Sequence, residues 1–500
     1  MSLNWLRDGS LTPARGFYIS PPRVYVPLPM EQTAGESTRP AAEPAQKPAE
    51  PPLRRMGMPR RLWVPCAAPA PTGLVGSGGA LAEPVRSKAY GVDVERGDVL
   101  TEFVGPSAYA PRAPAGGRVM GVEPVRLTDG REAPAVILEP HRPGEIPKDE
   151  AANAAAPHAP QPAADLFGEI APGERAQWIE ALRLAGVWAD RWASPDLLGQ
   201  LHQSIRRPVD TVVCNALDPD RALPLQSLLA ASFSAELAAG VDLLAKLAGA
   251  ERAWVVFDEL AGDLAERLRA SVEQASGGAL AGDGAGGRPR LVPLGNDYPQ
   301  ANPTLLLYTL LGRRLAPGHL PTESGVLVFD AAAAVAVGRF VFTREPMTTV
   351  PVALWDVVQG RGHFVEAPLG SPLRDVIAFT GTAPDLTLIR GGTPPRDLRV
   401  GGGAVVAGSE LTAYASPPEP DVNPDPCIRC GWCVEACPVH IHPAALLEAA
   451  QRDDQELADE SGLDACIDCG VCNYVCPARL PLLDGIRLLR RRRDTGWTRP

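Results

Sequence analysis

Two short stretches near the C-terminal end decide what the sequence says about the fold: CIRCGWCVEACPVH at 427–440 and ACIDCGVCNYVCPARL at 465–480. Each contains the spacing C-x-x-C-x-x-C-x-x-x-C-P, and together they hold eight of the ten cysteines. In bacterial two-cluster ferredoxins this spacing binds iron, with three thiolates of a run on one cluster and the fourth on the other. The stretches therefore predict a ferredoxin-like domain over residues 416–488 that carries two [4Fe-4S] clusters.

The crossing rule assigns each cysteine to a cluster. The first cluster is expected on Cys427, Cys430, Cys433 and Cys476, and the second on Cys466, Cys469, Cys472 and Cys437. Gly431 and Gly470 are expected to let the backbone approach the inorganic sulfur closely. Asp468 and Asn473, inside the second stretch, are expected to be ordinary surface residues of the loop.

Other chemistries fit these cysteines less well. A zinc ribbon uses two C-x-x-C pairs and leaves no role for a third cysteine two residues further on. Disulfides are disfavoured, because the chain starts with no apolar run of signal-peptide length and so belongs in a reducing cytosol. Cys66 and Cys214 lie outside both stretches, and Cys214 sits in an apolar strand where a thiol behaves as a small hydrophobe. No catalytic role is expected for either.

The composition is that of a multidomain globular protein. Five hundred residues with 45% hydrophobic content exceed one hydrophobic core, and 54 prolines and 49 glycines indicate many linkers and turns. A net charge of −11 argues against a nucleic-acid partner. The most apolar stretch, residues 325–342, is interrupted by Asp330 and Arg339. It therefore predicts a buried strand followed by a helix rather than a membrane span.

Shifts in composition divide the chain into eight segments. They are an N-terminal segment (1–30), a Pro/Ala-rich linker (31–55), a β domain (56–140), a second linker (141–165), an α/β domain (166–350), a small β module (351–415), the cysteine domain (416–488) and a basic tail (489–500). Within the α/β domain we expect helices over 173–188 and 227–249 and strands over 209–217 and 250–258. Alternating strands and helices are typical of a parallel sheet, so the fold class is multidomain α/β and β.

With this order of segments, the two cysteine stretches resemble the RnfC family, the C subunits of Rnf ion-translocating electron-transport complexes. Weaker agreement comes from LGRRLAPGHLP (311–321) and REPMTTVPV (344–352). The resemblance implies a barrel-sandwich-like β domain, a Rossmann-like α/β domain of the complex I flavin-subunit type and an SLBB-like β-grasp module. The presumed hairpin tip of the β domain, residues 106–117, contains no lysine, so a covalent carrier role is not expected.

The resemblance also implies a function. Such a subunit relays electrons through its two clusters on the cytoplasmic face of the bacterial inner membrane, as a peripheral protein. Its expected partners are the membrane subunits and a ferredoxin-like iron-sulfur subunit of the complex, with ferredoxin or NADH as electron partner.

The chain departs from the family where FMN and NADH bind. The glycine-rich loop that follows the first helix reads LAGVWADRWASPDLLGQL (184–201) here, and keeps Gly186 and Pro195 only. Glycines let backbone N–H groups approach a phosphate, whereas Trp188 and Trp192 are expected to fill that space and Asp190 to repel the phosphate.

Two further family regions are altered. NALDPDRALPL (215–225) keeps Asn215, Asp218 and Pro219, while DYPQANPTLLLY (297–308) has neither the glycine nor the lysine expected after Tyr-Pro. FMN and NADH binding are therefore predicted to be weakened or absent. Two alternatives stay open: a flavin-dependent NADH dehydrogenase or cobalamin-reductase-type subunit with an intact nucleotide site, and a zinc-bearing scaffold without redox activity.

Overall fold

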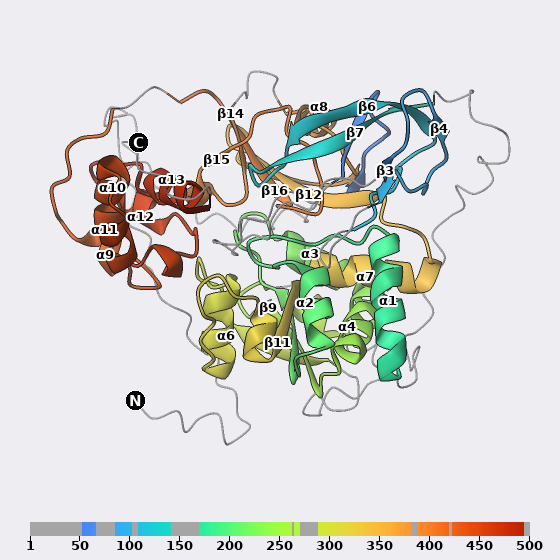
Figure 1. Ribbon diagram of the computed structural model, residues 1–500, viewed down its shortest axis with the longest axis horizontal. Coiled ribbons are helices and arrows are strands. Elements are labelled where there is room, and N and C mark those ends of the chain that lie inside the picture. Colours follow the sequence, from blue (N-terminus) through green and yellow to red (C-terminus); the bar gives the residue numbers. More distant parts are fainter. Residues whose placement is uncertain are drawn as a thin grey trace, which may run out of the picture.

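The computed structural model describes eight parts of the chain: residues 53–66, 86–102, 109–141, 170–262, 265–270, 289–382, 388–419 and 423–494. Figure 1 shows an α/β region below, β-rich layers above it and a small helical domain at one side, which is the cysteine domain. Mixed α/β and β sheets with a C-terminal cysteine domain agree with the predicted fold class at this level.

A four-stranded parallel sheet forms the centre of the α/β region. Its strand order is β10 (Arg290–Leu294), β9 (Arg252–Asp258), β8 (Thr211–Ala216) and β11 (Val326–Asp330). The strands are nearly continuous apolar runs, because helices cover both faces of the sheet. Val212 and Cys214 of β8 pack into the large core, whereas Val213 points to the opposite face.

Helices complete the two outer layers. The large core takes residues from α1 (Pro172–Leu184), α2 (Leu197–Ser204), α3 (Leu225–Ser232), α4 (Ser234–Ala248) and α7 (Ala331–Thr343), whereas the opposite face is covered by α6 (Pro303–Leu311). The predicted strand and helix over 325–342 are confirmed as β11 and α7. The short 3-10 helix η2 (Pro321–Ser324) leads into β11.

The single helix predicted over 227–249 is wrong. The chain forms α3 and α4, which meet at Phe233 with non-helical backbone angles and a bend of 96°. Close packing fixes the direction of α4, since a Cβ at Gly240 would lie 1.9 Å from the carbonyl oxygen of Ala334 in α7. Tertiary packing therefore overrides the helical pattern. Within the described residues no single helix is long and apolar enough to cross a membrane, and only α3 and α4 together, as this bent pair, meet the length and composition.

Two further sheets build the β-rich layers. A mixed sheet has the order β1 (Arg54–Arg55), β13 (Arg361–Pro368), β12 (Thr349–Asp356), β16 (Thr412–Ser416), β14 (Leu388–Gly391) and β15 (Leu398–Arg399), with α8 (Leu373–Thr380) beside β13 and η3 (Pro394–Arg396) between β14 and β15. An antiparallel sheet has the order β2 (Leu62–Pro65), β7 (Glu132–Pro140), β6 (Gly117–Arg126) and β4 (Asp93–Val94), and β3 (Arg86–Ser87) pairs with β5 (Thr101–Glu102). β1 belongs to the segment expected as a linker.

The cysteine domain consists of short helices around two turns. Its elements are α9 (Trp432–Glu435), α10 (Pro443–Arg452), α11 (Gln455–Glu460), η4 (Leu463–Ala465), α12 (Val471–Tyr474) and α13 (Leu482–Asp494). α9 begins after the first C-x-x-C turn and α12 after the second, so the two runs start in the same way. α10 and α13 pack together and close the domain's own core.

Candidate metal centre

The two cysteine runs fold into the same backbone turn. Arg429 and Asp468, each just before the second cysteine of its run, have φ of 55° and 54°. Gly431 and Gly470, just after it, have φ of 80° and 75°. Side chains other than glycine rarely adopt such angles, so their repetition marks a shared loop geometry. The two turns therefore share a backbone conformation around their second cysteine.

The surroundings of two thiols include cysteines of the other run. Burial raises the pKa of Cys433, and the negative charges of Cys476, Cys430 and Cys427 raise it further. Burial likewise raises the pKa of Cys472, followed by the charges of Cys466, Cys437 and Cys433. Each of these two thiols thus responds to at least one thiol of the other run.

These donors suit iron-sulfur chemistry. The eight thiols of the two runs are all free and offer the soft ligands that iron-sulfur clusters require. The thiols differ in exposure: Cys427 and Cys430 are exposed, whereas Cys437, Cys469 and Cys472 are buried. Clusters held here would therefore sit in different surroundings.

The second turn is built into the rest of the protein. Tyr298 donates its hydroxyl to the carbonyl oxygen of Cys469 at 2.5 Å, and Trp192 donates its indole N–H to that of Ile467 at 2.6 Å. The Trp192 and Tyr298 rings stack at 5.8 Å. Cys469, Val471 and Val475 also share a hydrophobic cluster with Trp192 and with residues of α6 and the parallel sheet. A Cβ at Gly470 would lie 1.8 Å from the carbonyl oxygen of Pro395.

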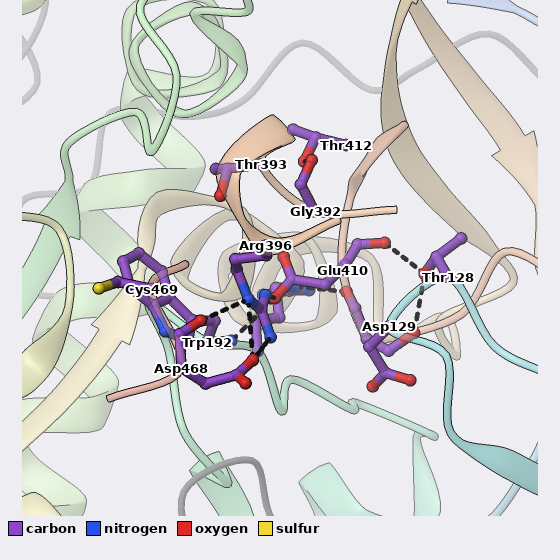
Figure 2. Close-up of polar contacts among 12 residues, drawn as sticks. Thr128, Asp129, Trp192, Gly392, Thr393, Arg396, Glu410, Thr412, Asp468 and Cys469 are labelled. Atoms are coloured by element: carbon purple, nitrogen blue, oxygen red, sulfur yellow. Dashed lines mark hydrogen bonds and ion pairs between the residues drawn. The ribbon is translucent and has the colours of Figure 1, made fainter. Parts of the chain in front are cut away.

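Arg396 connects this turn to the mixed sheet. Its guanidinium is 5% exposed and donates to Glu410 at 2.5 Å and to the Asp468 carboxylate at 3.0 Å. Its Nε also donates to the Asp468 carbonyl oxygen at 3.2 Å, and it lies 5.6 Å from the Trp192 ring centroid. Figure 2 shows Arg396 between Glu410 and Asp468, beside Trp192. The guanidinium therefore ties three segments together in a largely dehydrated place.

The expectation that Asp468 and Asn473 are ordinary surface residues is wrong. The Asp468 side chain is 18% exposed and accepts from Arg487 at 2.8 Å as well as from Arg396. Burial alone would raise the pKa of Asp468, but the charges of Arg487 and Arg396 outweigh burial and hold the pKa well below its usual value. Asn473 accepts the backbone N–H of Leu483 at 2.8 Å. The partners of Asp468 lie far along the chain, so its role has no local signal.

The altered loop at 184–201 is occupied by its own side chains. Trp188 is 4% exposed and stacks on Tyr109 of the β-rich layer at 4.7 Å. Asp190 pairs with Arg131 at 2.8 Å. Arg191 forms a buried double contact with Asp330, at 2.7 and 2.8 Å. The large side chains of the loop thus contact other regions of the protein.

Seven backbone N–H groups of this loop are also engaged. Asp190 donates to Gly408, Arg191 to the carbonyl of Ser194, Trp192 to the Glu410 carboxylate, Ser194 to Arg191, Asp196 to the Asp190 carboxylate, Leu197 to Ala189 and Gly199 to the Asp196 carboxylate. A phosphate loop needs such groups free and convergent. The residues present therefore do not fit the phosphate of FMN.

The other two altered regions are joined to this loop. Asn215 donates its amide to the carbonyl oxygens of Ala193 at 3.1 Å and Ala301 at 2.8 Å. Asp218, 4% exposed, accepts from the backbone N–H of Gln226 and from the hydroxyl of Ser227 at the start of α3. Burial raises the pKa of Asp218 to about 7 against these hydrogen bonds, which lower it. Asn215 and Asp218, the two polar residues that this chain shares with the family region, therefore both have hydrogen-bond partners within the chain.

The two cysteines outside the runs are buried thiols. Cys66 donates its thiol to the carbonyl oxygen of Pro134 at 3.1 Å, and burial raises the pKa of Cys66 to about 12. Cys214 lies in β8, where burial raises its pKa well above the usual value. Both thiols stay protonated near neutral pH and are poor nucleophiles.

Two regions of the chain match models of known protein families. Residues 199–339 match the family model of the Nuo51 FMN-binding domain, and residues 419–477 match that of the 4Fe-4S dicluster domain. The first match begins beyond Trp188 and Trp192. Among solved structures, an NAD+-reducing NiFe hydrogenase in the H2-reduced state is similar with a TM-score of 0.42 and 18% identity, covering 68% of this chain and 65% of that chain.

Curated relatives share one kind of description. The C subunit of the ion-translocating oxidoreductase complex of Rhodobacter capsulatus is 28% identical over 420 residues, which cover 81% of this chain and 74% of that protein. The protein of the same description from Pseudomonas aeruginosa is 27% identical over 56% of this chain and 35% of its own length. The C subunit of the Na(+)-translocating ferredoxin:NAD(+) oxidoreductase complex of Acetobacterium woodii is 25% identical over 49% of this chain and 54% of its own length.

Proposed function

Because this chain is a divergent relative of RnfC, the C subunit of Rnf ion-translocating oxidoreductase complexes, we propose that it is an electron-transfer subunit of such a complex. The observation that carries this function is the pair of four-thiol groups within a matched 4Fe-4S dicluster domain. The chain carries two [4Fe-4S] clusters, which accept and donate single electrons.

The ligand sets follow from the grouping of the thiols. We assign Cys427, Cys430, Cys433 and Cys476 to the first cluster and Cys466, Cys469, Cys472 and Cys437 to the second. The thiols whose charges raise the pKa of Cys433 are Cys476, Cys430 and Cys427, and those that raise the pKa of Cys469 are Cys466, Cys472 and Cys437, which supports this division. In this arrangement the two clusters are neighbours, as a relay requires.

Partners and place follow from the relatives. We propose that the chain associates with membrane subunits and a ferredoxin-like iron-sulfur subunit, and exchanges electrons with ferredoxin or an NADH-side partner. It would then be a peripheral protein on the cytoplasmic face of the bacterial inner membrane. We further propose that the β2-β7-β6-β4 sheet belongs to a barrel-sandwich-like domain and the β1–β15 sheet to an SLBB-like β-grasp module, within the segment limits given above.

The α/β domain serves in this proposal as a scaffold that has lost FMN and NADH binding. The loop at 184–201 supports this, since its amides and side chains are engaged with the chain itself. The alternative flavoenzyme needs that loop to open and release those contacts.

Analysis of anaerobically purified full-length protein tests the proposal. We expect about eight iron and eight sulfide per chain, visible absorbance that bleaches with dithionite, and no stoichiometric flavin after denaturation. Stoichiometric flavin with bleaching by NADH alone would establish the flavoenzyme instead. Zinc in place of iron would establish the scaffold.

A further inference from the structure

Four consecutive carbonyl groups of the second turn each accept a hydrogen bond from a side chain. Arg490 of α13 donates to the oxygen of Cys466, Trp192 to that of Ile467, Arg396 to that of Asp468 and Tyr298 to that of Cys469. Only Arg490 belongs to the cysteine domain. The other three donors are 275, 72 and 171 residues away along the chain.

Trp192 and Tyr298 come from two of the three regions that depart from the family's nucleotide site. The Trp192 ring is 6% exposed and stacks on Tyr298, so both donors are held in fixed orientations. Asn215, from the remaining region, bridges the carbonyl oxygens of Ala193 and Ala301 and so links the segments that carry them. The altered nucleotide site therefore forms one connected support beneath the second turn.

The first turn provides an internal reference. It has the same backbone angles at Arg429 and Gly431, yet every residue from 423 to 430 is exposed. Its carbonyl groups face a different dielectric from those of the second turn, in which Cys469 and Gly470 are buried.

Hydrogen bonds and charges around a cluster set its reduction potential, because the reduced cluster carries one more negative charge. A donor that binds a loop carbonyl reduces the negative potential which that carbonyl directs at the cluster. Arg396, Arg487 and Arg490 add positive charge around the second turn, partly balanced by Asp468 and Glu410.

We propose that Trp192, Tyr298 and Arg396 are positioning residues of the second cluster: they fix its binding turn and raise its reduction potential relative to the same turn without them. The role presupposes the proposed ligand set of that cluster. Under this proposal Trp192 and Tyr298, which come from the altered nucleotide-site regions, contribute to electron transfer.

Conservative variants of the full-length holoprotein test this role. Trp192→Phe and Tyr298→Phe each remove one donor and keep the ring that packs against its neighbour. Trp254→Phe and Tyr90→Phe are matched controls, because the indole N–H of Trp254 has no hydrogen-bond partner, Tyr90 is exposed, and both residues lie outside the cysteine domain. Arg396→Met is left out of this test, because it would also remove the ion pairs with Glu410 and Asp468 and so change the charge around the turn.

The readout is an anaerobic redox titration followed by electron paramagnetic resonance, with iron and sulfide analysis of each sample. In the Trp192→Phe/Tyr298→Phe double variant we expect one of the two midpoint potentials to fall, by about threefold to tenfold in the equilibrium constant for reduction, where tenfold is 59 mV for one electron. The other potential and both control variants should stay at the wild-type values.

Two unshifted potentials in the double variant, with both clusters present, would overturn the positioning role and leave the electron-transfer function standing. An equal shift of both potentials would overturn it too, because the support touches only one turn. A wild-type chain with fewer than two clusters would overturn the electron-transfer function as well.

Discussion

The two cysteine turns have the same backbone and opposite surroundings. The first carries Ile428 and Trp432 at 66% and 51% exposure, and a Cβ at Gly431 would meet nothing within 4 Å. The second is enclosed by α6, η3 and the loop at 184–201. The difference shows that the motif determines the backbone of a turn, whereas residues far along the chain determine what surrounds it. One turn is exposed and the other is enclosed by the chain itself.

The glycines of the two turns give the largest expected contrast. Gly431→Ala and Gly470→Ala both place a Cβ at positive φ, which costs about 1–2 kcal/mol. Gly470→Ala additionally drives that Cβ into the Pro395 carbonyl, so we expect a total above about 4 kcal/mol and partial loss of iron. Denaturant midpoints followed by cluster absorbance and iron content measure both. An equal loss of stability and of iron in the two variants would mean that the contact with Pro395 contributes nothing.

The arginines near the two turns give the next contrast. Arg396→Met removes one buried partner from both Glu410 and Asp468, although Arg487 still pairs with Asp468, and should cost about 3 kcal/mol. Arg479→Met breaks an exposed pair with Asp425, 57% and 64% exposed, and should cost about 0–1 kcal/mol. Unfolding of the holoprotein in denaturant measures the difference. A cost of Arg396→Met near that of Arg479→Met would show that Arg487 alone is a sufficient partner for Asp468.

A buried carboxylate in the α/β region, Asp218, is expected to make the stability of the protein depend on pH. The pKa of Asp218 is raised from 3.8 to about 7 when folded, so the folded state holds its proton longer than the unfolded state. This contribution to stability is complete below pH 4 and is lost as the pH rises through 7. Asp218→Asn should therefore remove that slope and stabilise the protein at pH 8 by about 2 kcal/mol, after weaker hydrogen bonds to α3 are counted.

Denaturant midpoints followed by circular dichroism between pH 5 and 8 test the sign. Asp454→Asn, which alters the capping carboxylate of α11 in the cysteine domain, is the control. A slope that persists in Asp218→Asn would assign the pH dependence to another group.

Thiol labelling gives the smallest expected contrast. After chelation of iron under native conditions, iodoacetamide should modify Cys427 and Cys430, which are exposed, about tenfold faster than Cys469 and Cys472. Burial raises the pKa of both slower thiols, which lowers their thiolate fraction. Peptide mass spectrometry measures the order. Uniform labelling would show that the second turn separates from α6, η3 and the loop at 184–201 when iron is removed.

Local pattern was sufficient for several elements and for the 4Fe-4S dicluster domain. The apolar runs at 211–216 and 252–258 form strands because they are buried on both faces, and the cysteine spacing identifies the iron-sulfur domain. The filling of the loop at 184–201 by Trp188 and Trp192 was also visible in the sequence. These features depend on short-range chemistry.

What the sequence did not reveal depends on distant partners. Asp468 looked like a surface residue because Arg396 and Arg487 meet it only in the folded chain. Asp190 was expected to act on a phosphate but pairs with Arg131 of the β-rich layer. The break at Phe233 carries no glycine or proline and follows from the packing of α4 on α7.

The loop at 184–201 acts as a joint between regions of the chain. Arg191 donates to the carbonyl oxygen of Ser409 and to the Asp330 carboxylate, and Trp192 donates to the carbonyl oxygen of Ile467. Glycine at either position would remove contacts to more than one region at once. Substitutions in this loop are therefore expected to act on the whole assembly of regions rather than on the loop alone.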